Sequence, residues 1–304
     1  MKKLEKEAVL RERMILVGAV SFFIFILPYL LHVGLHGIQP MTADSFGGIP
    51  QSISVSVSGS RESIQLENYL VGALARNSEV GYETESLKAI AIVLRSNAVC
   101  CILEERSAER DSFYTDEELR ILWGREYEEN LQRYRDVVTS TEGIVLFYDG
   151  EIISVPYHRL SSGVTRDSGL WQKPVPYVAS VESPEDMYAD DFYEKIEIRK
   201  ELLGPDFKVL FYDRFGYALQ VQIKEETLQG EVFCQKYRLP SANFEYESDD
   251  EEYIFHVRGC GHGFGMSLYG ADSLAGKGWS FDEILQYYYP GIEIRRENRD
   301  DVSA

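Results

Sequence analysis

A stretch near the amino terminus carries no Asp, Glu, Lys or Arg, and it constrains the whole chain more than any other feature. The charge-free stretch runs from Met14 to Ala43, and its apolar part runs from Met14 to Leu35. At a helical rise of about 1.5 Å per residue this apolar part covers roughly 33 Å, enough to cross a hydrocarbon core of about 30 Å. A cleaved signal peptide has an apolar region of only about 7–15 residues. The sequence therefore predicts an uncleaved transmembrane helix over residues 14–36.

The residues in front of this helix indicate its orientation. Basic residues before a first membrane span favour an amino terminus inside the cell, and residues 1–13 contain five Lys or Arg: Lys2, Lys3, Lys6, Arg11 and Arg13. We therefore expect a single-pass protein of the cell membrane with its folded domain outside. The expected parts are a cytoplasmic tail (1–13), the transmembrane helix (14–36), a stalk (37–51), one domain (52–294) and a polar tail (295–304).

Composition limits the partners and cofactors of this domain. The chain has 50 acidic and 31 basic residues and a net charge of −19, which disfavours nucleic acid as a partner because phosphate binding needs concentrated Lys and Arg. The four cysteines are Cys100, Cys101, Cys234 and Cys260. None of them forms a C-x-x-C pair, so we expect no structural zinc module. We also expect no cofactor and no metal. Whether these cysteines form disulfides is left open.

Hydrophobic periodicity predicts an α+β fold with a helical first part and a largely antiparallel, β-rich remainder. Alternation over 53–57 predicts a strand, and helical spacing over 66–74 and 87–101 predicts two helices, with a partly helical segment over 111–135. Asp149-Gly150 between two apolar runs predicts a hairpin with a type I′ turn. A second β ribbon is expected over 207–223. A capping box at Ser280–Glu283 predicts a late helix.

The densest chemical signal is a run in which every second residue is glycine. Glycines at 259, 261, 263 and 265 enclose His262. Glycine weakens a strand, so this alternation indicates that something approaches the backbone closely, either a flat sugar ring or a packed neighbouring chain. His262 then either presents its imidazole in a binding site or is a hydrogen-bonded core residue, and both interpretations stay open.

A second candidate segment follows the predicted hairpin. His158 stands at a strand end beside a Ser/Gly turn at 161–163, where it could act as a general acid or base or could cap the turn. A metal site built from His158, His262 and Cys260 is a further alternative, although the sequence does not show that these residues meet. Trp171 and Tyr177 follow this turn and could stack on sugar faces or belong to the core.

These motifs resemble those of the SpoIID/LytB family. The segment from Gly259 to Ala271 is similar to the family's GxGHGxGMSQxGA motif, and Tyr288–Gly291 matches its closing YYPG. The segments 66–72, 87–91, 141–143 and 157–165 resemble further family motifs in the same order. The resemblance covers roughly 52–294, so it implies the family's fold for the whole predicted domain.

The resemblance also implies a function. Members are membrane-anchored proteins that act on peptidoglycan glycan strands in sporulation, alongside partners such as a cell-wall amidase, and the sporulation member is a lytic transglycosylase. By position in the family motifs, the substrate-binding residues expected here are His158, Ser162, Gly163, Thr165, Gly261, His262, Gly263, Gly265, Met266 and Ser267.

The family's catalytic Glu falls on Asn77 in this chain, which cannot donate and recover a proton at neutral pH. The nearest carboxylate, Glu79, lies two residues on, which is about 200° around a helix. Glu79 could serve as the general acid/base only if the helix has ended before it. Two hypotheses follow: a glycan-binding protein without an acid/base at position 77, and an active lytic transglycosylase that uses Glu79.

Overall fold

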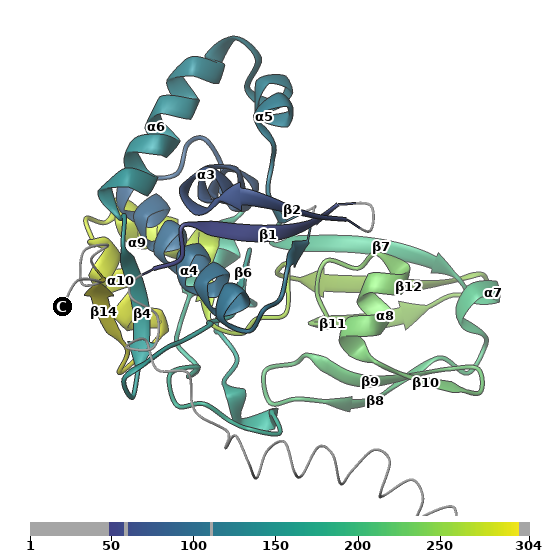
Figure 1. The fold of residues 1–304 in the computed structure, drawn as a ribbon. Coiled ribbons are helices and arrows are strands. Elements are labelled where there is room, and N and C mark those ends of the chain that lie inside the picture. Colours follow the sequence, from purple (N-terminus) through teal and green to yellow (C-terminus); the bar gives the residue numbers. More distant parts are fainter. Residues whose placement is uncertain (1–48, 58–59, 110–111, 298–304) are drawn as a thin grey trace, which may run out of the picture. The chain divides into compact units, whose positions relative to one another are not determined.

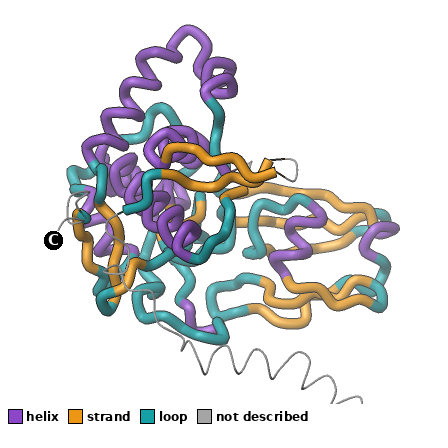
Figure 2. The backbone as a smooth tube through the Cα atoms, viewed as in Figure 1, coloured by secondary structure: helices purple, strands orange, loops and turns teal. Residues whose placement is uncertain are grey.

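The computed structural model describes residues 49–57, 60–109 and 112–297, all of which belong to one compact unit (Figure 1). The predicted cytoplasmic tail, the transmembrane helix over 14–36, most of the stalk and the end of the polar tail lie outside these described residues. Figure 2 shows the helices gathered in one part of the unit and a second part that consists mainly of strands. Two separate hydrophobic cores correspond to these two parts.

The first core is built around a helical layer. It contains α3 (Leu66–Asn77), α4 (Thr84–Leu103), α5 (Asp116–Trp123) and α6 (Tyr127–Ser140), with a 3₁₀ turn at Gly124–Glu126. A small sheet of β1 (Ser52–Val57), β2 (Ser60–Gln65) and β3 (Ala108–Glu109) covers it. The predicted alternation in β1 is confirmed, since Ile53 and Val55 are buried while the serine between them is partly exposed.

Helix α4 is the centre of this core. It contacts α3 and α6, and also α9 (Leu268–Gly276), α10 (Phe281–Tyr288) and β4 (Ile144–Tyr148). In the described part of the chain α4 alone is long and apolar enough to cross a membrane by length and composition, and most of it is buried inside the protein. Its apolar side chains therefore face other elements of this core, as expected of a central helix that is hydrophobic on most sides.

The hairpin predicted at Asp149-Gly150 is confirmed. β4 (Ile144–Tyr148) pairs antiparallel with β5 (Glu151–Ile152), and both turn residues have positive φ, 53° and 82°. A type I′ turn requires positive φ at both central residues, which Asp-Gly tolerates well. On its other edge β4 pairs with β14 (Glu293–Arg296), so the end of the described chain completes this sheet.

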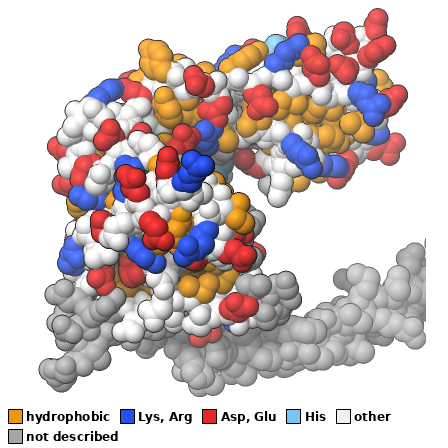
Figure 3. Space-filling model, turned by 90° about the horizontal axis from the view of Figure 1, so that it is seen from above, with side chains coloured by type: hydrophobic (Ala, Val, Ile, Leu, Met, Phe, Trp, Pro, Cys, Tyr) orange, Lys and Arg blue, Asp and Glu red, His pale blue; other side chains and the backbone are white. Residues whose placement is uncertain are grey.

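The second core lies between two three-stranded antiparallel sheets. One sheet orders β11 (Phe244–Ser248), β12 (Glu252–Arg258) and β7 (Tyr193–Arg199), and the other orders β10 (Glu226–Gln229), β9 (Ala218–Ile223) and β8 (Lys208–Tyr212). The predicted ribbon over 207–223 is confirmed by the pairing of β8 with β9. Helices α7 (Lys200–Leu203) and α8 (Gly230–Tyr237) accompany these sheets. Figure 3 shows apolar side chains exposed on this part among acidic and basic ones.

The α+β class is confirmed, but the expected order of helices first and strands later is only partly right. Strands β1 and β2 precede the helices, and helices α9 (Leu268–Gly276) and α10 (Phe281–Tyr288) return at the end to pack on α4. The capping box at Ser280 and Glu283 does begin α10. Two strand pairs are parallel rather than antiparallel: β1 with β3, and β6 (Tyr157–His158) with β13 (Met266–Ser267). These pairs join segments far apart in sequence, which local periodicity cannot predict.

Candidate functional site

The end of α3 positions the first candidate residues. Asn77 is the last residue of the helix, and its Nδ2 donates to the Ala73 carbonyl at 2.8 Å. Ser78 takes an extended conformation and its hydroxyl donates to the Leu74 carbonyl at 2.7 Å. The helix therefore ends before Glu79, which satisfies the condition under which Glu79 can lie on the same side as Asn77.

The two histidine segments, about a hundred residues apart, are brought together by a short parallel pair. β6 (Tyr157–His158) pairs with β13 (Met266–Ser267). Leu160 and Cys260 form a further bridge, as do Arg166 and Phe264. As a result the rings of His158 and His262 lie with centroids 5.9 Å apart.

The alternating glycines are explained by a packed neighbouring chain. Gly259, Gly261, Gly263 and Gly265 all have positive φ. A Cβ on Gly261 would lie 2.8 Å from the His158 Cβ, and one on Gly265 would overlap the backbone carbonyl of Pro156. Glycine is needed because L side chains are strained at these dihedrals. A Cβ at position 259, 261 or 265 would also collide with the segment 156–161, and one at Gly263 would collide with the Tyr217 side chain. Of the two alternatives, the backbone approach is therefore accounted for without a sugar.

His158 is neutral, and its environment fixes which nitrogen carries the proton. The side chain is 4% exposed, and Nδ1 lies 3.0 Å from the Phe264 carbonyl. A carbonyl only accepts, so Nδ1 carries the hydrogen and Nε2 holds a lone pair. That Nε2 is buried and has no hydrogen-bond partner among the described residues. Burial, with smaller contributions from His262 and Arg166, lowers the pKa of His158 to about 3.

His262 has the opposite tautomer. Its Nδ1 accepts the Phe264 backbone N–H at 3.1 Å, so the neutral ring carries its hydrogen on Nε2. Burial, followed by the nearby Arg166 guanidinium, lowers its pKa to about 4. The pair thus contains one acceptor nitrogen, the buried Nε2 of His158, and one donor nitrogen, Nε2 of His262, and both rings are uncharged at neutral pH.

Arg166 anchors the glycine-rich loop to the strand-rich part. Its Nε lies 2.7 Å from Asp213 and its Nη1 3.0 Å from Glu231 on α8, and Nη1 also donates to the His262 carbonyl at 2.8 Å. The guanidinium lies 4.1 Å from the Phe264 ring centroid and 4.4 Å from that of Tyr217. Sequence reasoning did not single out Arg166. The available signal was an arginine placed directly after the Ser/Gly turn and its threonine.

A pocket of about 200 Å³ opens beside His158. We call it the histidine pocket, and it is lined by Arg76, Asn77, Ser78, Glu79, Tyr82, Tyr157, His158, Arg159 and Leu268. Glu79 accepts from Nη2 of Arg159 at 3.1 Å, and the same arginine pairs with Asp191. The structure thus places Asn77, Glu79 and His158 at one pocket, while His262 stands behind His158 rather than in its lining.

Several other predicted site residues have structural contacts instead. Thr165 is fully buried, and its hydroxyl accepts the Val181 N–H at 2.9 Å. Met266 is fully buried as well. Ser267 caps α9 by accepting the Gly270 N–H at 3.1 Å, and it donates to Asp186 at 2.8 Å. These residues support the loop from inside the protein.

A buried carboxylate accepts a hydrogen bond from the backbone of the Ser/Gly turn at 161–163. Asp186, which sequence reasoning missed, accepts the Ser161 N–H at 2.8 Å, and burial raises its pKa. Ser162 and Gly163 are partly exposed at this turn.

The two aromatic residues considered for sugar stacking have protein partners. The Trp171 ring lies edge to face with the Phe264 ring, with centroids 5.3 Å apart, and the Tyr177 ring packs on that of Tyr148 with centroids 5.0 Å apart. Both aromatic rings are partly buried and have protein partners.

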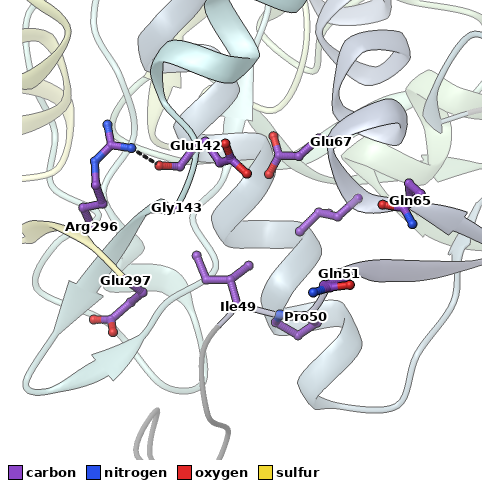
Figure 4. Close-up of a pocket in the computed structure, with 10 residues that line it drawn as sticks. Ile49, Pro50, Gln51, Gln65, Glu67, Glu142, Gly143, Arg296 and Glu297 are labelled. Carbon is purple, nitrogen blue, oxygen red and sulfur yellow. Dashed lines mark hydrogen bonds between the residues drawn. The ribbon is translucent and has the colours of Figure 1, made fainter. Parts of the chain in front are cut away.

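A second pocket, of about 250 Å³, lies elsewhere on the unit (Figure 4). Glu67 and Glu142 point toward one another across it, and Arg296 donates to the Glu142 carbonyl (Figure 4). The Glu67 carboxylate is held by the fully buried Arg95, with Nη2 to Oε2 at 2.9 Å. This pocket contains none of the predicted site residues, and its main charged pair supports the core.

Among the described residues, no three His, Cys, Asp or Glu side chains converge in a way that would hold a metal ion. The thiols of Cys100, Cys101, Cys234 and Cys260 are all unpaired. Burial raises the pKa of Cys100 to about 12 and also raises that of Cys260. These cysteines are therefore thiols rather than thiolates at neutral pH.

Comparisons with known proteins relate this chain to one family. A family model described as "Stage II sporulation protein" matches residues 57–148, and this match supports the resemblance to the SpoIID family. The chain is 29% identical over 278 residues to stage II sporulation protein D of Bacillus subtilis (strain 168), covering 83% of this chain and 81% of that protein. The protein of the same name from Bacillus amyloliquefaciens is 28% identical over 284 residues, covering 85% and 81%. A shorter match, 44% identical over 48 residues, joins 16% of this chain to 7% of the amidase enhancer of B. subtilis.

Proposed function

We propose that this protein binds peptidoglycan glycan strands at the histidine pocket and does not cleave them. The observation that carries the proposal is the side chain at position 77. Asn77 lines the pocket at the position that the family resemblance assigns to the catalytic Glu, and its amide donates within its own helix. The pocket therefore keeps polar groups suited to a sugar without the acid expected at that position.

The chemistry of lytic cleavage explains why this substitution matters. A carboxylic acid protonates the glycosidic oxygen, and the resulting carboxylate then takes a proton from the sugar's own hydroxyl, so one Glu serves both steps. An amide neither donates a proton to the leaving group nor recovers one near neutral pH. Asn77 can still hydrogen-bond a sugar through its carbonyl oxygen, so binding and cleavage separate at this residue.

An active transglycosylase that uses Glu79 is the second candidate. It is favoured by the end of α3 at Asn77, which lets Glu79 line the same pocket. Against it, Glu79 is an exposed carboxylate whose Oε1 contacts the Arg159 guanidinium at 3.1 Å. A general acid must donate its proton to the glycosidic oxygen at the moment of bond cleavage, and the Arg159 guanidinium already contacts one of the two Glu79 carboxylate oxygens.

Incubation of the purified full-length protein with amidase-treated peptidoglycan separates the two candidates. We expect co-sedimentation with the glycan and no 1,6-anhydro products by mass spectrometry. Anhydro products that disappear in Glu79→Gln would establish the second candidate and overturn the first. Asn77→Glu is the informative companion, because it restores a carboxylate at the family position without altering Glu79.

For the cell, we propose a membrane-anchored role in cell-wall remodelling during sporulation, with the domain outside and a cell-wall amidase as a partner. The charge-free residues 14–36 and the relatives named for sporulation and amidase enhancement support this proposal. Protease treatment of intact protoplasts tests the orientation. The domain should be degraded without lysis, and protection of the domain would contradict it.

A further inference from the structure

Two arginines line the histidine pocket, and only one of them is neutralised. Arg159 pairs with both Glu79 and Asp191. Arg76, in the last turn of α3, forms no ion pair with any carboxylate of the described residues. In a chain with 50 acidic and 31 basic residues, an arginine at a pocket without an acidic partner is a feature to explain.

The side chain of Arg76 has one ring partner that orients it. Its guanidinium carbon lies 5.2 Å from the centroid of the Tyr114 ring, within the range of a cation–π contact. The backbone of Tyr114 is hydrogen-bonded to α3, because its N–H donates at 3.2 Å to the carbonyl of Gly72, which lies one helical turn before Arg76. Stacking on a ring leaves the in-plane N–H groups of a guanidinium free for a second partner.

The remaining polar groups of the pocket are mostly uncharged or already paired. His158 is neutral, Asn77 carries an amide, and Glu79 and Arg159 satisfy each other. A ligand that fits this pocket therefore combines a largely uncharged polar body with one negative charge placed toward Arg76. Planar guanidinium and carboxylate groups pair through two parallel hydrogen bonds, the geometry that arginine serves best.

We propose that Arg76 is a subsite for the free carboxylate of an acidic amino sugar, the lactyl carboxylate of N-acetylmuramic acid in the glycan strand. This inference rests on the proposed function, because it assumes that the histidine pocket holds a glycan. It adds a specificity residue. The pocket distinguishes a strand with free lactyl carboxylates from a neutral strand of similar shape, and Arg76 makes that distinction.

The test compares three ligands with the full-length protein in detergent. The ligands are amidase-treated glycan strands, the same strands with their carboxylates converted to methylamides, and chitin oligosaccharides, which carry no lactyl group. A hydrogen bond to a charged group contributes about 1.5–3 kcal/mol, and about 1.4 kcal/mol is tenfold in affinity. We therefore expect the free-acid strands to bind at least about tenfold more tightly than the methylamide strands, and Arg76→Gln to abolish this difference.

A matched control and the opposite outcomes complete the design. Arg125 is an exposed arginine outside the pocket, so Arg125→Gln should bind all three ligands as the wild type does. Equal binding of free-acid and methylamide strands by the wild type would overturn the Arg76 subsite and leave the proposed function standing. If Arg76→Gln still bound free-acid strands tenfold more tightly than methylamide strands, the Arg76 subsite would also be overturned and the proposed function would stand. Failure of the folded wild type to bind any of the three ligands would overturn the proposed function, and the subsite with it.

Discussion

The imidazole rings of His158 and His262 lie with their centroids 5.9 Å apart and carry their protons on opposite nitrogens. Both tautomers are set by one residue, because the Phe264 carbonyl faces Nδ1 of His158 and the Phe264 N–H donates to Nδ1 of His262. The two peptide units on either side of the Phe264 Cα therefore orient the two imidazole rings. Any shift of the glycine-rich loop would therefore change the hydrogen-bonding character of both histidines together.

The lowered pKa values of the two histidines predict how binding depends on pH. With values of about 3 and about 4, neither ring gains a proton as the pH falls from 8 to 5. Glycan binding should therefore stay nearly constant over about pH 5–8. Co-sedimentation in buffers of constant ionic strength checks this. A binding transition centred near 6.5, the ordinary pKa of histidine, would show that one of the two rings gains a proton in this range and would contradict the prediction.

The same shifts predict a loss of stability in acid. The unfolded chain binds protons at these histidines below about pH 6.5, while the folded protein takes them up only near pH 4 and pH 3. Stability is therefore fully present above pH 6.5 and falls as the pH drops through this window, by roughly 1.4 kcal/mol for each unit of pKa difference as an upper limit. Urea denaturation at several pH values measures it. His158→Gln should lower stability at pH 7 and flatten its decline in acid.

Gly265 provides a test of the packed-chain explanation, with Gly291 as its control. Both have positive φ, 69° and 80°, but a Cβ on Gly265 would overlap the Pro156 carbonyl, whereas one on Gly291 would meet nothing within 4 Å. Gly291→Ala should cost about 1–2 kcal/mol from backbone strain alone. Gly265→Ala should cost clearly more, as measured by chemical denaturation. Equal costs would mean that the loop yields to the added methyl group.

Local sequence patterns predicted local structure well. The Asp149-Gly150 turn, the alternation in β1 and the capping box at Ser280 each depend on residues close together in the chain, and each is confirmed. The family motifs pointed to both histidine segments. The sequence patterns could not predict which segments pair with each other in the fold. The parallel pairing of β6 with β13 joins residues about a hundred positions apart, and nothing within either segment encodes that distance.

The ion pairs of the site could not be predicted from sequence patterns either. Arg166 meets Asp213 and Glu231 only because the strand-rich part folds back onto the glycine-rich loop. Glu79 and Arg159, 80 residues apart, form their pair for the same kind of reason. Which arginine is neutralised and which stays without an acidic partner is decided by tertiary structure, so the sequence alone gave no reason to select Arg76.

Arg166 should be the most costly side chain of the site to remove. Its side chain is 4% exposed and that of its partner Asp213 is 1% exposed, so Arg166→Met leaves a buried carboxylate without its charged partner, held only by the Phe215 and Tyr217 N–H groups. Breaking such a pair costs roughly 3–5 kcal/mol. In the double variant with Asp213→Asn the total loss should be smaller than the sum of the two single losses. Additive losses in urea denaturation would show that the two groups do not depend on each other.

Glu67 and Glu79 allow a matched comparison of two carboxylate–arginine pairs. Glu67 holds Arg95, whose side chain is 0% exposed, while Glu79 and Arg159 have side chains that are 64% and 42% exposed. Replacing Glu67 by Gln removes the charged partner of a buried guanidinium. We expect a loss of about 2–3 kcal/mol, less than the roughly 3–5 kcal/mol for a fully buried pair, because the Glu67 side chain is 29% exposed and Gln keeps one acceptor oxygen. Glu79→Gln removes only a solvated pair and should cost less than about 1 kcal/mol. Thermal and urea denaturation of the two variants check this order. If Glu79→Gln destabilised the protein as much as Glu67→Gln, Glu79 would be a structural residue, and its loss could not serve as a clean test of catalysis.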